Sequence, residues 1–266
     1  MRIGFIGAGQ MATALATGIS KGTSGCEISA FDPNPDAIEN LGGSIGDTNF
    51  KHCESNVELA RCSDIVFIAV KPQVIESALQ GLSDVFEPGK TYVSVVAGIW
   101  ISRLQELSGC TQIIRTMPNT PCLIGAGVVA MAASDSVPEE KVEEVRGLLT
   151  QVGKVVDVSE SQLDAVTGIS GSGPAYVYTF VESLIDGGVL SGLPRHIARE
   201  LALETVLGAT KMIAQSGEHP SLLRDRVTSP GGTTVHGLAA LEQGGFRNSV
   251  QSAVAAATKR AGELGG

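Results

Sequence analysis

The sequence predicts an α/β fold in two parts, a mostly parallel sheet followed by an all-helical region. Short β-branched runs alternate with helical segments from residue 2 to residue 158, and this alternation favours right-handed βαβ crossovers in a parallel sheet. Beyond Asp164 the strand patterns stop and only helical patterns remain. We therefore expect one domain at 1–160 and a second at 161–266.

The N-terminal part combines apolar runs of strand length with segments of helical pattern. Proline follows several of the runs, as at Pro33, Pro72 and Pro118, and Pro138 suits the first turn of a helix. The expected strands are 2–7, 27–32, 64–70, 91–97, 112–117, 127–133 and 154–158, and the expected helices are 10–21, 36–41, 56–62, 74–82, 101–107 and 138–152.

The C-terminal part is expected to form four helices, at 175–189, 194–215, 234–244 and 246–264. The first two are apolar around much of their circumference, and such helices are normally buried. A region of this size has too little structure of its own to cover them. We therefore expect a dimerisation domain that packs against a second copy, as a homodimer. The alternative is a single well-packed domain that rests on the sheet.

Composition excludes several classes of protein. The net charge is −9 with no Lys/Arg cluster, so neither nucleic acid nor a membrane surface is an expected partner. No run of 18 apolar residues occurs, and the N-terminus lacks the apolar segment of a signal peptide. Five scattered cysteines without CxxC spacing, and four histidines without HxH or HxxxH pairs, predict no metal site and a reducing, cytoplasmic location.

A glycine turn near the N-terminus predicts a Rossmann-like, doubly wound domain. Gly7, Gly9 and Ala12 have the spacing of the dinucleotide fingerprint, between a strand and a helix. Asp32 ends the next strand, where a carboxylate binds the ribose hydroxyls of NAD and repels a 2′-phosphate. No Lys or Arg follows before Lys51, so the residues favour NADH. Asp32 also suits a turn before Pro33, and that alternative stays open.

Two Gly/Ser/Thr/Pro-rich segments, 162–176 and 225–238, run into helical stretches and are interpreted as loops that form anion sites. Together with the glycine turn they indicate an enzyme that holds a small carboxylate beside a nicotinamide. We expect the backbone of 231–233 to bind the carboxylate and Thr234 to hydrogen-bond the substrate, with Thr167 and Ser172 completing a polar wall. Each hydroxyl could instead only cap a helix.

The segments GFIGAGQMA, SDIVFIAVKP, VAGI, RTMPNTP, DAVTGISGSGPAYVY and SPGGTT occur in this order from residue 4 to residue 234. Together they resemble the pyrroline-5-carboxylate reductase family. The resemblance implies reduction of 1-pyrroline-5-carboxylate to L-proline, the last step of proline biosynthesis, with NADPH or NADH. It also implies a homodimer, which in some members assembles into a ring of dimers.

The resemblance and the strand ends together yield a set of candidate site residues. Thr234, Ser172 and Thr167 are the candidate catalytic residues, and the candidate substrate-binding residues are Ser229, Gly231, Gly232, Thr233, Thr234 and Glu218. The candidate cofactor-binding residues are Ile6, Gly7, Ala8, Gly9, Gln10, Met11, Ala12, Asp32, Asn34, Asn56, Ala69, Val70, Lys71, Pro72, Val95, Ala97 and Asn119. The chain departs from the family at Asp32, where relatives often carry a small hydroxyl residue, and at Arg226, where some carry asparagine.

This residue set suits imine reduction, because a protonated cyclic imine is already electrophilic and mainly needs to be oriented. A β-hydroxy acid dehydrogenase is the nearest alternative, but it uses a lysine in the helix after its glycine loop, and 170–190 contains none. A non-catalytic dinucleotide-sensing protein is the second alternative. Catalysis by His219 or His236 is less favoured than a structural role.

Overall fold

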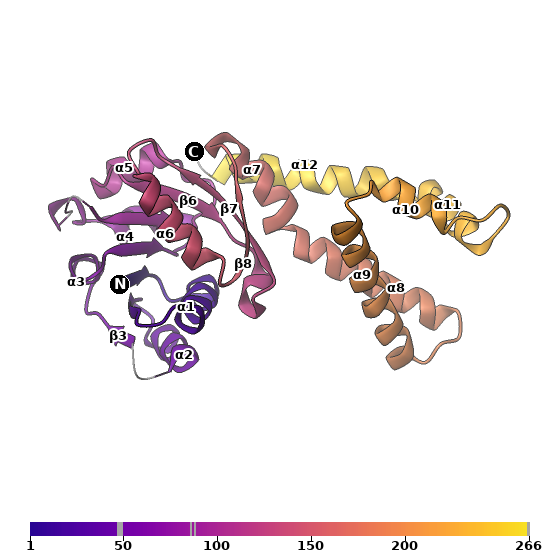
Figure 1. The fold of residues 1–266 in the computed structure, drawn as a ribbon, viewed down its shortest axis with the longest axis horizontal. Helices are drawn as coiled ribbons and strands as arrows, with labels where there is room; N and C mark the ends of the chain where they lie inside the picture. Colours follow the sequence, from indigo (N-terminus) through magenta and orange to yellow (C-terminus); the bar gives the residue numbers. More distant parts are fainter. Residues whose placement is uncertain (47–49, 86, 88, 265–266) are drawn as a thin grey trace. The chain divides into compact units, whose positions relative to one another are not determined.

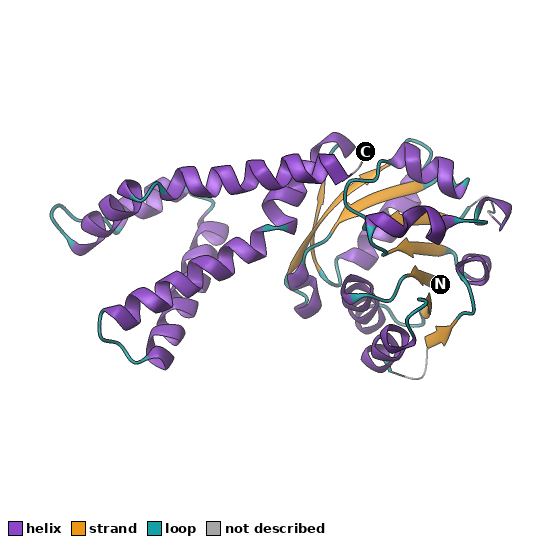
Figure 2. Cartoon of the chain, turned by 180° about the vertical axis from the view of Figure 1, so that it is seen from behind, coloured by secondary structure: helices purple, strands orange, loops and turns teal. Residues whose placement is uncertain are grey.

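A computed structural model covers residues 1–266 and describes all of them except 47–49, 86, 88 and 265–266. The chain divides into two compact units, one made of Met1–Ser172 with Val254–Gly266 and the other of Gly173–Ala253. The described strands all belong to the first unit, and the second unit is helical (Figure 2).

The first unit is built on a sheet of eight strands in the order β3-β2-β1-β4-β5-β6-β7-β8. All neighbouring strands are parallel except β6 and β7, which are antiparallel (Figure 1). The strands are β1 (Arg2–Ile6), β2 (Glu27–Phe31), β3 (Phe50–His52), β4 (Ile65–Ile68), β5 (Thr91–Ser94), β6 (Ile113–Met117), β7 (Gly127–Ala133) and β8 (Gly153–Asp157).

Helices cover both faces of this sheet, as the doubly wound prediction requires. Side chains alternate along β4, so that Phe67 packs in one core and Val66 in the other. The first core is covered by α1 (Gln10–Gly22), α2 (Pro35–Ile45) and α6 (Glu139–Leu149), and the second by α3 (Asn56–Cys62), α4 (Ile75–Leu79) and α5 (Ile101–Ser108). The rings of Phe5 and Phe67 stack in the first core with centroids 4.9 Å apart. The predicted fold class is confirmed.

The carboxyl ends of β1 to β6 lie at one edge of the sheet, because these strands are all parallel. The order reverses at β1, from which the chain proceeds to β2 on one side and later to β4 on the other. Ligands bind at such a switch point in open α/β sheets. The fold thus directs attention to the residues that follow β1, β2 and β4.

The second unit contains α8 (Gly173–Leu190), α9 (Arg195–Ser216), α10 (Pro220–Arg226), α11 (Thr233–Gln243) and the start of α12 (Phe246–Leu264). Helices α8 and α9 approach closely at Gly188, where an added Cβ would lie 3.0 Å from the Cβ of Ala198. Tyr176 Oη donates to the carbonyl of Ala253 (3.3 Å), and the rings of Phe180 and Phe246 lie 5.9 Å apart.

The structure differs from the sequence-based expectation in four places. Strand β3 and helix α10 are additional elements, and the predicted helix at 74–82 is the shorter α4 flanked by 3₁₀ turns at Pro72–Val74 and Ser83–Val85. The segment 162–176 is helical rather than a loop: α7 (Leu163–Val166) continues through a π-helical turn at Thr167–Gly171, after which α8 begins. Strand β3 is too short to show a periodic pattern in the sequence. In 162–176, Gly168 and Gly171 resemble loop residues although they allow close helix packing.

Candidate active site

The glycine turn after β1 has the geometry of a dinucleotide site. Gly7 adopts φ +92° and donates to the carbonyl of Phe31 (2.8 Å), and a Cβ at this position would lie 2.6 Å from the carbonyl oxygen of Ala69. A Cβ on Gly9 would meet nothing within 4 Å. Gly9 is the N-cap of α1, whose first turn carries no acidic side chain. The turn therefore leaves an open, positively polarised helix end that fits a diphosphate.

A cavity of about 440 Å³ adjoins this turn, at the switch point of the sheet. Its size is within the range of small-molecule sites. It brings together the glycine turn, the end of β2, the start of α3, the end of β4 and helix α4. The residues that line it are Ile6, Gly7, Gly9, Phe31, Asp32, Pro33, Asn56, Ala69, Val70, Lys71, Val74, Ser77 and Ala78.

Asn56 contributes a free acceptor to this cavity. Its Nδ2 donates to the carbonyl of Ala78 (2.9 Å), which fixes the side chain, while Oδ1 is buried and has no partner among the described residues. A buried amide oxygen without a donor costs on the order of 1–3 kcal/mol, which a hydroxyl of a bound coenzyme would offset. The cavity residues therefore fit a dinucleotide.

Eight of the predicted cofactor-binding residues line the cavity, and nine do not. Ala12 is fully buried where α1 packs on the sheet, and Asn119 Oδ1 accepts from the backbone N–H of Val128 (3.0 Å). Asn34 caps α2 by accepting from Asp36 N (3.1 Å). The nine are Ala8, Gln10, Met11, Ala12, Asn34, Pro72, Val95, Ala97 and Asn119. The sequence prediction missed Phe31, Pro33, Val74, Ser77 and Ala78, which have no motif signal.

The turn that contains Thr167 and Ser172 is held by close helix packing. A Cβ on Gly168 would lie 2.3 Å from Thr258 Oγ1, and one on Gly171 would lie 2.8 Å from Met117 Cε. Thr167 Oγ1 donates to the carbonyl of Leu163 (2.9 Å), and the Thr167 carbonyl accepts from Ser172 N (2.9 Å). The backbone N–H of Ser172 is thus used within the helix, so only side-chain hydroxyls of this pair remain for a substrate.

The segment 229–234 does form a loop that runs into a helix. Gly231 adopts φ +68°, and the N–H of Gly232 donates to the carbonyl of Ser229 (3.1 Å). Gly232 is the N-cap of α11, with no side-chain cap and no acidic residue in the first turn. The first N–H groups of α11, on Thr233 and Thr234, therefore point at an open helix end where an anion is favoured.

Glu218 precedes this loop and forms an ion pair. Its two carboxylate oxygens lie 2.9 and 2.7 Å from the guanidinium nitrogens of Arg226. The pairing fixes both side chains and offsets the charge of Glu218. Arg226, a position at which the chain departs from the family pattern, thus has a partner in the same unit.

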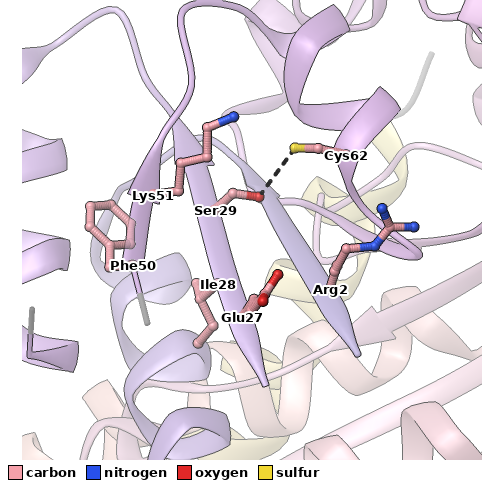
Figure 3. Close-up of a pocket in the computed structure, with 7 residues that line it drawn as sticks. All are labelled: Arg2, Glu27, Ile28, Ser29, Phe50, Lys51 and Cys62. Carbon is pink, nitrogen blue, oxygen red and sulfur yellow. Dashed lines mark hydrogen bonds between the residues drawn. The ribbon is translucent and has the colours of Figure 1, made fainter. Parts of the chain in front are cut away.

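A second cavity lies at the opposite edge of the sheet, where β1, β2 and β3 begin (Figure 3). The residues that line it are Arg2, Glu27, Ile28, Ser29, Phe50, Lys51 and Cys62. Its two cations already have partners, because Arg2 pairs with Asp64 and Lys51 Nζ lies 2.8 Å from Glu58 Oε1. This cavity contains none of the predicted site residues.

Metal-ligating side chains are dispersed rather than gathered. In the part of the chain that the structure describes, no cluster of three or more His, Cys, Asp or Glu side chains could hold a metal ion. Within the same residues, no helix combines the length and the apolar character that a membrane crossing needs.

Comparison with known proteins agrees with this geometry. A family model described as pyrroline-5-carboxylate reductase dimerisation matches residues 160–264, and one described as NADP oxidoreductase coenzyme F420-dependent matches residues 2–98. The pyrroline-5-carboxylate reductase of Arabidopsis thaliana is 43% identical over 99% of this chain and 95% of its own. That of Pisum sativum is 42% identical over 98% and 95%.

Solved structures agree as well. Pyrroline carboxylate reductase of Plasmodium falciparum, crystallised with NADP bound, superposes with a TM-score of 0.89 at 35% identity, over 100% of this chain and 98% of its own. The Coxiella burnetii reductase superposes with a TM-score of 0.89 at 32% identity, over 99% and 98%.

The fold and the glycine-turn cavity define an oxidoreductase of the dinucleotide-binding class. Within that class, the chain belongs to the pyrroline-5-carboxylate reductase family, as its full-length relatives show. The predicted family is therefore confirmed.

Proposed function

We propose that this chain reduces 1-pyrroline-5-carboxylate to L-proline with NADPH or NADH, the last step of proline biosynthesis. The proposal is supported by an open glycine turn with an adjoining cavity. The sequence of the same chain matches pyrroline-5-carboxylate reductases over nearly its whole length. Neither a β-hydroxy acid dehydrogenase nor a non-catalytic sensor accounts for that match.

The N-terminal domain, 1–160, binds the coenzyme, which supplies a hydride when bound. The helix end at Gly9 binds its diphosphate, and Asn56 Oδ1 accepts from one of its hydroxyls. Lys71 lines the same cavity and makes no ion pair with any described residue, so its charge is available to a phosphate. Asn119 accepts from Val128 N and does not line this cavity.

The C-terminal domain, 161–266, binds the substrate. The N–H groups of Thr233 and Thr234 bind the carboxylate at the uncapped start of α11, in a turn shaped by Gly231 and Gly232. The Thr234 hydroxyl hydrogen-bonds the ring nitrogen or the carboxylate. Ser229 and Glu218 complete this wall, Glu218 as a pair with Arg226. Thr167 and Ser172 are further candidate catalytic residues through their hydroxyl groups.

The helical unit is the surface through which the chain forms a homodimer, and the dimers can assemble further into a ring. None of the residues of α8 is buried in the single chain, and only Ala198 and Ala202 are buried in α9. Large apolar side chains on these helices are exposed, among them Leu190 (89%), Tyr178 (63%) and Leu201 (54%). Exposed apolar surface on this scale marks an association site. The five free cysteines support a cytoplasmic location.

The activity is tested by following the loss of reduced-nicotinamide absorbance when the purified chain is mixed with pyrroline-5-carboxylate. Turnover with this substrate, and none with β-hydroxy acids, is the expected result. Absence of turnover with the imine, or turnover only with a β-hydroxy acid, contradicts the proposal.

The role of Thr234 is tested by Thr234→Ala, with Thr150→Ala as the matched control. Loss of one transition-state donor lowers turnover by up to about 10²–10³. Thr150 Oγ1 bonds only the carbonyl of Gly147 on an exposed helix end, so the control keeps full turnover. Unchanged turnover in a folded Thr234→Ala variant removes Thr234 from the mechanism.

A further inference from the structure

An acidic side chain lies at the end of β2, where the adenosine ribose of a dinucleotide binds in this fold. We infer that this chain uses NADH in preference to NADPH, and that Asp32 sets the preference. The inference rests on the proposed function, because it concerns the coenzyme of that reaction.

The Asp32 carboxylate is held in place by two backbone amides. Oδ2 accepts from Ala8 N (2.9 Å) in the glycine turn, and Oδ1 accepts from Asn34 N (2.9 Å). Each oxygen keeps acceptor capacity beyond these bonds, so the group can accept from the two ribose hydroxyls of NADH. A 2′-phosphate offers acceptors and negative charge at the same position and is therefore repelled.

The start of α2, which follows Asp32 and Pro33, leaves no backbone N–H of its first residues free for a phosphate. Pro35 has no N–H, Asp36 N is taken by Asn34 Oδ1 (3.1 Å), and Ala37 N is taken by the Asn34 carbonyl (3.2 Å). Asp36 adds a second carboxylate in the first turn of the helix. This helix end, which in other proteins binds anions, here repels them.

The first basic side chain that follows Asp32 in the sequence is directed elsewhere. Lys51, the first Lys or Arg after Asp32, pairs with Glu58 and lines the second cavity beside Arg2 and Cys62 (Figure 3). Lys71 is the basic residue of the coenzyme cavity. It follows β4, and β1 separates β4 from β2 in the sheet, so Lys71 lies on the diphosphate side of the switch point.

The test measures kcat/KM with NADH and with NADPH for the full chain, and the dissociation constant of each coenzyme from its own fluorescence. A carboxylate about 4 Å from a phosphate of charge about −1.5 to −2 lowers affinity about tenfold or more, even in water. We expect at least this preference for NADH. Asp32→Ser should shift the ratio by about tenfold or more towards NADPH.

Two further variants keep the test decisive. Asp32→Asn removes the charge with little change of shape, and should improve NADPH binding even if Asp32→Ser folds poorly. Glu27→Gln removes a carboxylate at the other end of the same strand (Figure 3) and should leave the ratio unchanged. A wild-type preference for NADPH overturns the inference, and so does a ratio that Asp32→Asn and Asp32→Ser leave unchanged. If neither coenzyme supports imine reduction, the proposed function fails, while the two dissociation constants still decide the coenzyme inference.

Discussion

Two glycines of the same turn should respond in opposite ways to an added methyl group. Gly7→Ala places a Cβ 2.6 Å from the carbonyl oxygen of Ala69 and requires φ +92° of an alanine. The left-handed backbone costs about 1–2 kcal/mol, and the clash with a backbone atom adds to it, so a loss of about 2–4 kcal/mol in the free energy of unfolding is expected.

Gly9→Ala meets no such obstacle in the protein. Gly9 has φ −70°, and its added Cβ has no neighbour within 4 Å. Removing a glycine at a compatible position stabilises a protein by about 0.4–1 kcal/mol through the unfolded state. The methyl group does, however, occupy the space at the start of α1 that the diphosphate requires. We expect coenzyme affinity to fall by about tenfold or more, the equivalent of about 1.4 kcal/mol.

The assay is thermal or urea unfolding of both variants with and without coenzyme, at one protein concentration, because dimer formation also affects apparent stability. Gly7→Ala should unfold earlier in both conditions. Without coenzyme, Gly9→Ala should be about 0.4–1 kcal/mol more stable than the wild type, and it should lose the stabilisation that coenzyme brings. Equal destabilisation of the two variants, or wild-type affinity in Gly9→Ala, would refute the reasoning about this turn.

Three other predictions concern the first unit. Lys90 is 5% exposed and donates to three carbonyls around the end of α3, so Lys90→Met should cost about 2–4 kcal/mol in urea unfolding; a cost near zero contradicts this role. Burial raises the pKa of the Cys53 thiol to about 12, so an alkylating reagent at pH 8 should modify Cys62 first, as mass spectrometry of the labelled peptides can show. The hydrogen bond from Arg2 lowers the pKa of Asp64 below its usual 3.8, and its stabilisation is therefore present above that pH and lost as the pH falls below it. Arg2→Gln should remove this acid-side dependence from pH-resolved melting curves.

Much of the fold could be predicted because local signals agree with the tertiary structure. Helix α3 has its predicted bounds, since Ser55 accepts from Glu58 N (3.1 Å) as an N-cap. Strand β3 could not be predicted, because three residues are too few to establish a period. The loop prediction for 162–176 is wrong because Gly168 and Gly171, which resemble loop residues, instead permit close helix packing.

The candidate site, like the fold, could be predicted only in part. Gly7, Gly9 and Asp32, which line the cavity, could be singled out because the strand–turn–helix pattern that marks them is local in the sequence. Ser77 and Ala78 line the cavity because of how α4 packs against the sheet. No local sequence pattern predicts this packing. Asn119 follows a strand as the prediction required, but the backbone of Val128 takes up its amide oxygen.

Lys71 matters for a reason beyond direct contact. The chain carries a net charge of −9, so a long-range field repels the anionic coenzyme as it approaches. Of the residues that line the coenzyme cavity, Lys71 alone is basic, and its influence extends over only about 8–10 Å at physiological ionic strength. Moderate salt screens this repulsion at longer range, so the diffusional encounter with the coenzyme should become faster, not slower, as the ionic strength rises.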